Sequence, residues 1–167
     1  MDEKLIKKAI KGNFKAYSIL VNELKEDGYK IAYTILKNPD DSMDAYLQAV
    51  EKGLKNIKNL KEPKLFKTWF LRIVINESKN IISKNSNIVY LENIERDNSK
   101  IYNHEEKLDL ENAIKNLDED VKEMINLKFY LGYTLVEISE IMNLPLGSVK
   151  DKIYKSLKKL RKELQLK

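Results

Sequence analysis

The spacing of apolar residues constrains the fold of this chain more than any other feature of its sequence. Over residues 1–84, and again over residues 107–167, apolar side chains recur at every third or fourth position, the period of an amphipathic α-helix. Between these stretches, residues 85–106 are rich in Asn and Ser and lose that period. We therefore predict an all-α fold with two small helical domains, residues 1–84 and 107–167, joined by a flexible linker over residues 85–106.

In the first predicted domain, the dipeptide Asn38-Pro39 separates two helical stretches, because proline disfavours helix in the residue before it. Asp40, Asp41 and Ser42 are good N-cap residues, and from there we expect a helix to about residue 60. The apolar stripe of this helix includes Met43, Leu47, Val50, Leu54 and Ile57. After a loop at residues 61–64, a further helix starts near residue 65 and is expected to fade near residue 82.

The second predicted domain carries a characteristic series of helix starts and stops. Gly132 is a typical helix end, and Thr134 with Glu137 three residues later fits a capping box. Asn143-Leu144 then makes a tight turn, and Pro145 suits the first position of a final helix. A short capped helix, a tight turn and a longer helix make a helix-turn-helix, whose second helix enters the major groove of DNA.

Charge is unevenly distributed along the chain. The net charge of +5 combines +6 over residues 1–84, −6 over residues 85–123 and +5 over residues 124–167. Residues 148–167 alone carry eight basic and two acidic groups. Two basic ends around an acidic middle suggest that the ends contact nucleic acid. The side of the final helix that is expected to be exposed carries Ser148, Lys150, Asp151, Lys152, Tyr154, Lys155, Lys158 and Lys159.

Composition argues against several kinds of chemistry. The chain has no Cys and one His, His104, so the sequence predicts neither a thiol nucleophile nor a metal site built from these residues. Its five Gly residues are too scattered to form a phosphate-binding loop, and we expect no cofactor. No apolar run approaches the roughly 20 residues that a membrane-spanning helix needs, so we expect a cytoplasmic protein that does not insert into membranes.

The sequence resembles a known family over essentially its whole length. Residues 134–150 (TLVEISEIMNLPLGSVK) and the preceding residues 117–133 look like region 4 of bacterial RNA polymerase sigma factors of the extracytoplasmic-function (ECF) class. Residues 66–76 (FKTWFLRIVIN) resemble regions 2.3–2.4 of the same family, and residues 40–57 occupy the place of its region 2.2. The resemblance implies an alternative transcription initiation factor, which binds core RNA polymerase and directs it to specific promoters. Catalysis would stay with the polymerase, so the chain itself is not expected to be an enzyme.

The resemblance also implies roles for individual residues. In the first domain, the candidate polymerase contacts are Asp44, Gln48 and Glu51. The candidate contacts with the downstream (−10) promoter element, which this domain would recognise and melt, are Lys61, Lys64, Lys67, Trp69 and Arg72. In the second domain, the candidate contacts with the upstream (−35) element are Ser148, Lys150, Asp151, Lys152, Lys155 and Lys159. Members of this class are commonly held inactive by an anti-sigma factor, so the resemblance implies such a partner too.

Physical chemistry leaves part of this assignment open. Melted DNA needs aromatic surfaces for its bases and basic groups for its phosphates, and Phe66, Trp69 and Phe70 provide aromatic rings. An aromatic stripe at helical spacing is, however, more often part of a core. In the final helix, Asp151 and Lys152 stand where the family commonly has a small residue and Arg, so we expect an unusual promoter preference.

Two other functions compete with this interpretation. The chain could be a two-domain helix-turn-helix regulator that does not bind core polymerase, with the first domain used for dimerisation or ligand binding. Alternatively, Asp40, Asp41 and Asp44 could hold magnesium in a nucleic-acid enzyme. These three acids are better explained by their place at a predicted helix start, where capping and the helix dipole favour negative charge.

Overall fold

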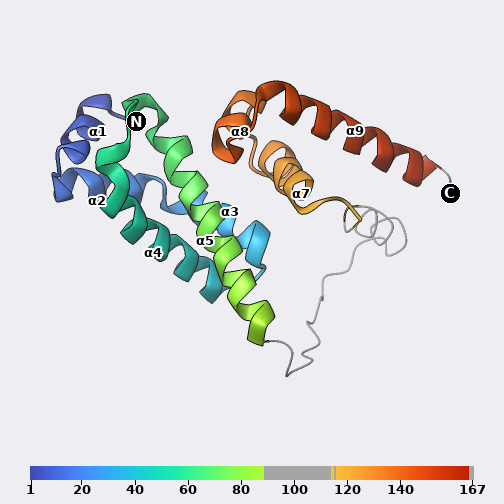
Figure 1. Ribbon diagram of the computed structural model, residues 1–167, viewed down its shortest axis with the longest axis horizontal. Helices are drawn as coiled ribbons and strands as arrows, with labels where there is room; N and C mark the ends of the chain where they lie inside the picture. The colour runs from blue at the N-terminus through green and yellow to red at the C-terminus, as the bar shows by residue number, and fades with distance from the viewer. Residues whose placement is uncertain (89–113, 115, 166–167) are drawn as a thin grey trace. The chain divides into compact units, whose positions relative to one another are not determined.

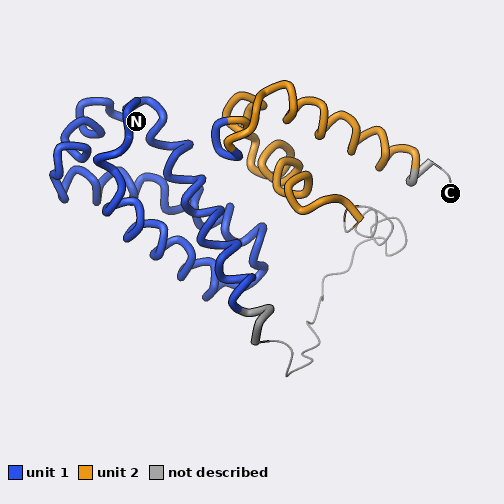
Figure 2. The backbone as a smooth tube through the Cα atoms, viewed as in Figure 1, with its two compact units in different colours: residues 1–90, 140–142 blue, residues 91–139, 143–167 orange. Residues whose placement is uncertain are grey.

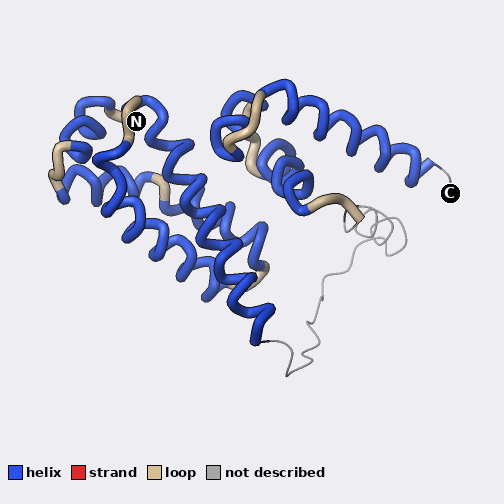
Figure 3. The backbone as a smooth tube through the Cα atoms, viewed as in Figure 1, coloured by secondary structure: helices blue, strands red, loops and turns tan. Residues whose placement is uncertain are grey.

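A computed structural model of the chain describes residues 1–88, 114 and 116–165, and within these residues all regular structure is helical (Figures 1 and 3). The predicted all-α class is therefore confirmed. The chain divides into two compact units, residues 1–90 with 140–142 and residues 91–139 with 143–167 (Figure 2). Among the described helices, none is both long enough and apolar enough to cross a membrane.

The N-terminal lobe consists of the helices α1 (Glu3–Ile10), α2 (Phe14–Glu23), α3 (Lys25–Leu36), α4 (Pro39–Asn56) and α5 (Phe66–Ile88). Helices α3, α4 and α5 pack pairwise against one another. Helix α1 packs against α2 and against two short 3-10 turns, η1 (Ile57–Asn59) and η2 (Pro63–Leu65). The loop expected at residues 61–64 thus overlaps η2. These turns, at the end of the lobe that α1 covers, join α4 to α5.

The core of this lobe is centred on aromatic side chains. Tyr17, Phe66 and Phe70 are completely or almost completely buried. The ring of Tyr17 meets that of Phe66 edge-on, with 6.4 Å between their centroids, and the Phe66 and Phe70 rings are stacked at 6.2 Å. The Tyr17 hydroxyl donates a 2.8 Å hydrogen bond to the carbonyl of Val50, and burial raises the pKa of this phenol. Because its one polar atom is paired, Tyr17 serves as an anchor between α2 and α4.

Helix α4 approaches this core through small residues. Ala45, Ala49 and Gly53 are buried on its inner face. A Cβ atom added to Gly53 would lie only 2.3 Å from the Tyr17 hydroxyl oxygen. The small side chains therefore allow α4 to pass close to the buried rings.

The apolar stripe expected on this helix does not form its buried face. Ile57 is buried, but Leu47 is 55% exposed and Leu54 is 37% exposed. The inward side of α4 is instead filled by small residues and by Tyr46, whose hydroxyl donates a 2.6 Å hydrogen bond to the Val21 carbonyl, and the leucines lie outward.

The start of α4 also differs from the expectation. Asn38 is the N-cap, and its side-chain oxygen accepts hydrogen bonds from the backbone N–H groups of Asp40 and Asp41. Pro39 takes the first helical position, where its missing N–H leaves no intrahelical hydrogen bond unmade. Asp40, Asp41 and Ser42 thus lie within the first turn instead of capping it, because the helix begins before them.

Helix α5 continues beyond the point at which we expected it to fade. It runs to Ile88, not to about residue 82. The polar residues 83–87 include neither Gly nor Pro, so nothing in their sequence breaks the helix. The first four residues of the predicted linker belong to this helix, and the rest of it, up to residue 106, lies outside the described residues. The predicted domain boundaries stay predictions.

The C-terminal lobe contains α7 (Glu119–Ile125), a π-helical turn (Asn126–Tyr130), α8 (Leu135–Met142) and α9 (Leu146–Gln165). Helix α7 packs directly on α9. One cluster joins Leu117 and Val121 to Leu160 of α9, with Ile114 and Ile125 at its edge. Met124, Ile138, Val149 and Ile153 are also buried. The inner face of α9 is thus fixed by apolar packing, which leaves its other side for solvent.

Candidate nucleic-acid interface

The helix-turn-helix starts with the capping box that the sequence predicts. The Thr134 hydroxyl accepts a 3.2 Å hydrogen bond from the Glu137 N–H, while the Glu137 carboxylate accepts a 2.8 Å bond from the Thr134 N–H. The Thr134 hydroxyl also donates to that carboxylate at 2.7 Å. These bonds satisfy N–H groups that a helix start leaves unpaired, and so fix where α8 begins.

The turn between α8 and α9 is held by its backbone. Asn143 adopts a left-handed conformation with φ of 56°, which Asn tolerates better than most residues. The next N–H, that of Leu144, donates a 3.0 Å hydrogen bond back to the Ser139 carbonyl. This pattern is a Schellman motif, so the predicted tight turn is confirmed. The final helix starts one residue later than the sequence predicts. Helix α9 begins at Leu146, and Pro145 precedes it, with its carbonyl accepting a 3.1 Å hydrogen bond from the Val149 N–H.

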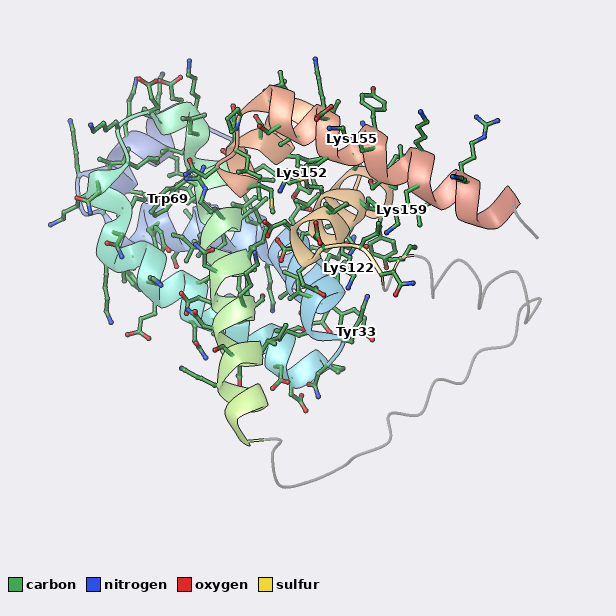
Figure 4. All side chains as sticks on the ribbon, turned by 45° about the vertical axis from the view of Figure 1, so that its right-hand side comes forward. Tyr33, Trp69, Lys122, Lys152, Lys155 and Lys159 are labelled. Carbon is green, nitrogen blue, oxygen red and sulfur yellow. The ribbon has the colours of Figure 1, made fainter. Side chains whose placement is uncertain are left out.

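Helix α9 separates a buried side from a basic side. Val149, Ile153, Ser156 and Leu160 are buried. The residues predicted to contact upstream promoter DNA are all exposed: Ser148, Lys150, Asp151, Lys152, Lys155 and Lys159. Figure 4 shows the side chains of Lys152, Lys155 and Lys159 on this helix. The structure therefore brings these candidates together on one helix, as the sequence predicts, and Tyr154 beside them is 62% exposed.

Two of these candidates form an ion pair with each other. The Lys155 ammonium lies 2.7 Å from the Asp151 carboxylate, and both side chains are largely exposed. The sequence predicts both as DNA contacts and does not by itself show that they are paired. Their spacing of four residues, with the acid first, is the signal that would have revealed the pair.

The residues proposed for the downstream promoter element are less uniform. Lys61 and Lys64 are exposed in the segment around η2. Lys67 is half-buried, and its ammonium lies 2.9 Å from the Asp27 carboxylate. This ion pair joins α5 to α3 across forty residues of sequence, so no local pattern could have predicted it. Arg72 lies further along α5.

The aromatic residues near this segment divide between core and surface. Phe66 and Phe70 are fully buried, so they belong to the core and do not offer rings to DNA bases. Trp69, on the same helix, is half-buried and lies 5.8 Å from Phe66 between ring centroids (Figure 4). Of the three rings, Trp69 alone keeps part of its surface accessible for stacking.

The candidate polymerase contacts lie on α4. Asp44 is exposed, Gln48 is half-buried, and Glu51 is exposed with its carboxylate 2.6 Å from the Lys55 ammonium. That hydrogen bond lowers the pKa of Glu51. Leu47 and Leu54 on the same helix are exposed, although the apolar spacing predicts that they are buried, because spacing alone does not say which face packs inward. Within the described residues, no group of three or more acids or histidines is arranged to hold a metal ion.

Comparison with known families gives two matches, one for each half of the chain. Residues 20–88 match the family model described as Sigma-70 region 2, and residues 107–160 match the one described as Sigma-70, region 4. The first covers most of the N-terminal lobe. The second includes the whole of the capping box, the turn and most of α9.

Comparison with curated proteins and solved structures extends these matches to nearly the full length. The chain is 29% identical over 182 residues to the ECF RNA polymerase sigma factor SigW of Bacillus subtilis, covering 99% of this chain and 97% of that one. SigV of the same organism, an RNA polymerase sigma factor, is 29% identical over 146 residues, 86% of this chain and 88% of that one. Among solved structures, CnrH in complex with the cytosolic domain of CnrY has the same fold, with a TM-score of 0.70, 18% identity, and coverage of 99% and 97%. The sigma factor RpoE of Bartonella quintana, solved with the anti-sigma factor NepR, gives a TM-score of 0.63 at 19% identity, with coverage of 92% and 97%.

Proposed function

Because this chain belongs to the sigma-70 family, as a sigma factor of the ECF class, we propose that it binds core RNA polymerase and directs it to a specific set of promoters. The observation that carries the proposal is the presence, in one chain, of a region 2 lobe and a capped helix-turn-helix of region 4. A helix-turn-helix alone would suit many DNA-binding regulators. The region 2 lobe therefore favours the initiation factor over a regulator that does not contact polymerase.

In this proposal the two lobes have different tasks. Helix α9 lies in the major groove of the upstream element and contacts it through its exposed basic side. The segment around η2, with Lys61, Lys64 and Trp69, contacts the downstream element as it melts. Lysine ammonium groups suit phosphate oxygens, whereas Asp151 is suited to accept a hydrogen bond from the amino group of cytosine.

Helix α4 is the proposed docking surface for core polymerase. Its outer side combines the carboxylates of Asp44 and Glu51 with the exposed Leu47. Apolar groups surrounded by charged ones are typical of protein interfaces. Polymerase performs the chemistry of RNA synthesis, so the chain acts by recognition in the cytoplasm, where polymerase and promoter meet.

We also propose that an anti-sigma factor controls this protein. CnrH and RpoE, which share its fold, were solved in complexes with the cytosolic domain of CnrY and with the anti-sigma factor NepR. A partner of this kind would prevent the lobes from reaching polymerase or DNA. Co-purification of the tagged chain from its host, followed by addition of the captured protein to a transcription reaction, would test this: the inhibitor should abolish promoter-specific transcripts.

In vitro transcription tests the main proposal. Core polymerase with this chain should produce discrete run-off transcripts from a subset of genomic fragments, and core polymerase alone should not. An Asp44→Ala, Gln48→Ala variant should lose affinity for core polymerase. The matched control is Asp40→Ala, which removes an exposed carboxylate from the first turn of the same helix and should keep the wild-type affinity for core polymerase. Binding of promoter duplex without any binding of core polymerase would overturn the proposal.

A further inference from the structure

Helix α1 carries a stripe of lysines that none of the proposed contacts uses. Lys4, Lys7, Lys8 and Lys11 are spaced by three, four and seven residues, so they share one helix face, and all four are exposed. Ile6 and Ala9 lie on the opposite face and are buried. The apolar side of α1 is therefore occupied by the lobe itself, and the lysine side faces solvent.

A second row of lysines runs beside this stripe. Lys58, Lys61 and Lys64 are exposed and belong to the segment of η1 and η2, against which α1 packs. At the C-terminal end of α1, the Lys58 side chain comes within 3.8 Å of where a Cβ of Gly12 would be. At its N-terminal end, Glu3 has its pKa lowered by a hydrogen bond from Lys7 and, to a smaller extent, by the charge of Lys64. The two rows are therefore neighbours and run in opposite directions.

Acidic side chains do little to balance this charge. Residues 1–12 and 57–64 contain seven lysines against Asp2, Glu3 and Glu62. Asp2 accepts the capping hydrogen bond from the Lys4 N–H, and Glu3 pairs with Lys7 at 2.7 Å. The surface made by the two rows, which we call the α1 patch, thus has a net charge of +4.

We infer that the α1 patch binds the phosphate backbone of promoter DNA, next to the downstream element; this inference rests on the proposed function. Lys61 and Lys64 are already proposed contacts with that element, and the α1 stripe continues the same positive surface. An eight-residue helix is about 12 Å long, the length of roughly three or four phosphates at about 3.4 Å each along one strand. Because contacts with phosphate oxygens carry no information about the bases, this binding is independent of sequence.

The chemistry of the patch favours DNA over other polyanions. A helix that lies on a membrane needs an exposed apolar face, and the apolar face of α1 is buried in the lobe. The buried centres of protein interfaces are depleted in lysine, whereas phosphate contacts are rich in it. An anionic membrane and an acidic protein surface are therefore the alternatives that the experiment must separate.

The test neutralises the three lysines of the stripe that form no ion pair among the described residues. The triple variant Lys4→Gln, Lys8→Gln, Lys11→Gln keeps the Lys7–Glu3 pair, and circular dichroism verifies its fold. Holoenzyme reconstituted with this variant is titrated against promoter DNA at several salt concentrations. Each lost contact should reduce the slope of log affinity against log salt by about 0.7 to 0.9, so three should reduce it by roughly 2 to 3. The matched control, Lys25→Gln, Lys37→Gln, Lys84→Gln, removes three exposed charges elsewhere on the lobe and should keep the wild-type slope.

A separate measurement distinguishes DNA from each alternative, an acidic protein surface and an anionic membrane. An unchanged slope in the triple variant overturns the inference. So does a loss of affinity for core polymerase measured without DNA, since the patch would then be a protein-docking surface. Co-sedimentation with phosphatidylglycerol vesicles that is lost in the variant, while promoter binding is kept, overturns it in favour of a membrane. If wild-type holoenzyme itself fails to bind and transcribe any promoter, the proposed function fails, which is a distinct result.

Discussion

The carboxylate of Asp151 holds the ammonium of Lys155 at 2.7 Å on the exposed side of α9, so the helix proposed to read DNA carries an internal ion pair. Both groups are well solvated, and such a pair contributes at most about 0.5 kcal/mol to stability. Its importance is therefore for DNA binding. When DNA approaches, Lys155 has to exchange a carboxylate for a phosphate.

Lys155→Ala should weaken binding of the upstream promoter element without unfolding the lobe. If Lys155 contacts a phosphate in the complex, the salt slope of binding should fall by about one. Fluorescence anisotropy with a labelled duplex over a salt series measures both quantities. Lys162→Ala, an exposed lysine further along the same helix, is the control. An unchanged slope would mean that Lys155 stays with Asp151 in the complex.

Asp151→Ala should change which sequences are preferred. A carboxylate in the groove repels phosphate but accepts a hydrogen bond from cytosine, so its loss should relax the preference at one base pair. The general affinity for duplex DNA should rise, because Lys155 is released to contact phosphate. Competition between duplexes that differ at single base pairs tests the first effect. Identical relative affinities before and after the substitution would rule out a direct contact between Asp151 and a base.

Thr134→Ala should destabilise the C-terminal lobe by roughly 1 kcal/mol, because the hydroxyl of Thr134 caps α8. Thermal unfolding followed by circular dichroism should show the loss. The single tryptophan, Trp69, lies in the other lobe, so its fluorescence transition serves as an internal reference. Thr134→Ser keeps the hydroxyl and should remain close to wild type. A shift of equal size in both variants would contradict the capping role.

Gly53→Ala should destabilise the N-terminal lobe by about 1 to 3 kcal/mol, although alanine has the better helix propensity. The added methyl group would collide with the Tyr17 hydroxyl, 2.3 Å away. Urea unfolding followed by Trp69 fluorescence measures the change. Gly147→Ala in α9, where an added Cβ would meet no atom from outside its own stretch of helix within 4 Å, is the control and is followed by circular dichroism because Trp69 lies in the other lobe. Combining Gly53→Ala with Tyr17→Phe should cost less than the sum of the two, and strict additivity would refute the proposed collision.

Lys52→Ala should lower the free energy of unfolding of the N-terminal lobe more at pH 7 than at pH 4. The Glu77 side chain is 9% exposed and lies 2.6 Å from Lys52. Burial raises the pKa of Glu77, but hydrogen bonds from Lys52 and Asn80 outweigh burial and hold it below its ordinary 4.5. Glu77 therefore stabilises the fold above pH 4.5, and this stabilisation is lost as the pH falls through the lower, folded-state pKa.

Without Lys52, burial should dominate and raise that pKa. We expect a loss of roughly 1 to 2 kcal/mol at pH 7 and a smaller loss at pH 4, measured by urea unfolding with Trp69 fluorescence. Lys55→Ala, whose partner Glu51 is exposed to solvent, should leave stability nearly unchanged at either pH, because water screens the pair. Equal losses at the two pH values would show that the ionised Glu77 does not need Lys52.

The features that the sequence predicts well are those fixed by neighbours along the chain. The Thr134 and Glu137 capping box and the turn at Asn143 depend on side chains and backbone within a few residues, and both agree with the structure. The basic side of α9 follows from the same local logic, because Val149 and Ile153 fix its rotation.

The features in which the structure differs from the sequence prediction depend on tertiary packing or on a choice between two neighbouring cap residues. Asn38 and Asp40 are both good caps, and the helical geometry of Pro39 favours the earlier start. The rotation of α4 depends on rings from other helices: Tyr17 leaves no room for a side chain at Gly53, and Phe70 packs against the buried Tyr46 of α4. Apolar period alone could not have assigned Leu47 to the surface.

The buried and exposed faces of α4 tolerate substitution to different degrees. Ala45, Ala49 and Gly53 are buried, and at Gly53 an added methyl group would lie 2.3 Å from the Tyr17 hydroxyl oxygen. Leu47 and Leu54 face outward, where a change of size or polarity leaves core volume untouched. The inner face of α4 is therefore held fixed by the packing of the lobe, whereas its outer face can be constrained only by what docks on it, so substitutions there can alter binding to core polymerase without unfolding the lobe.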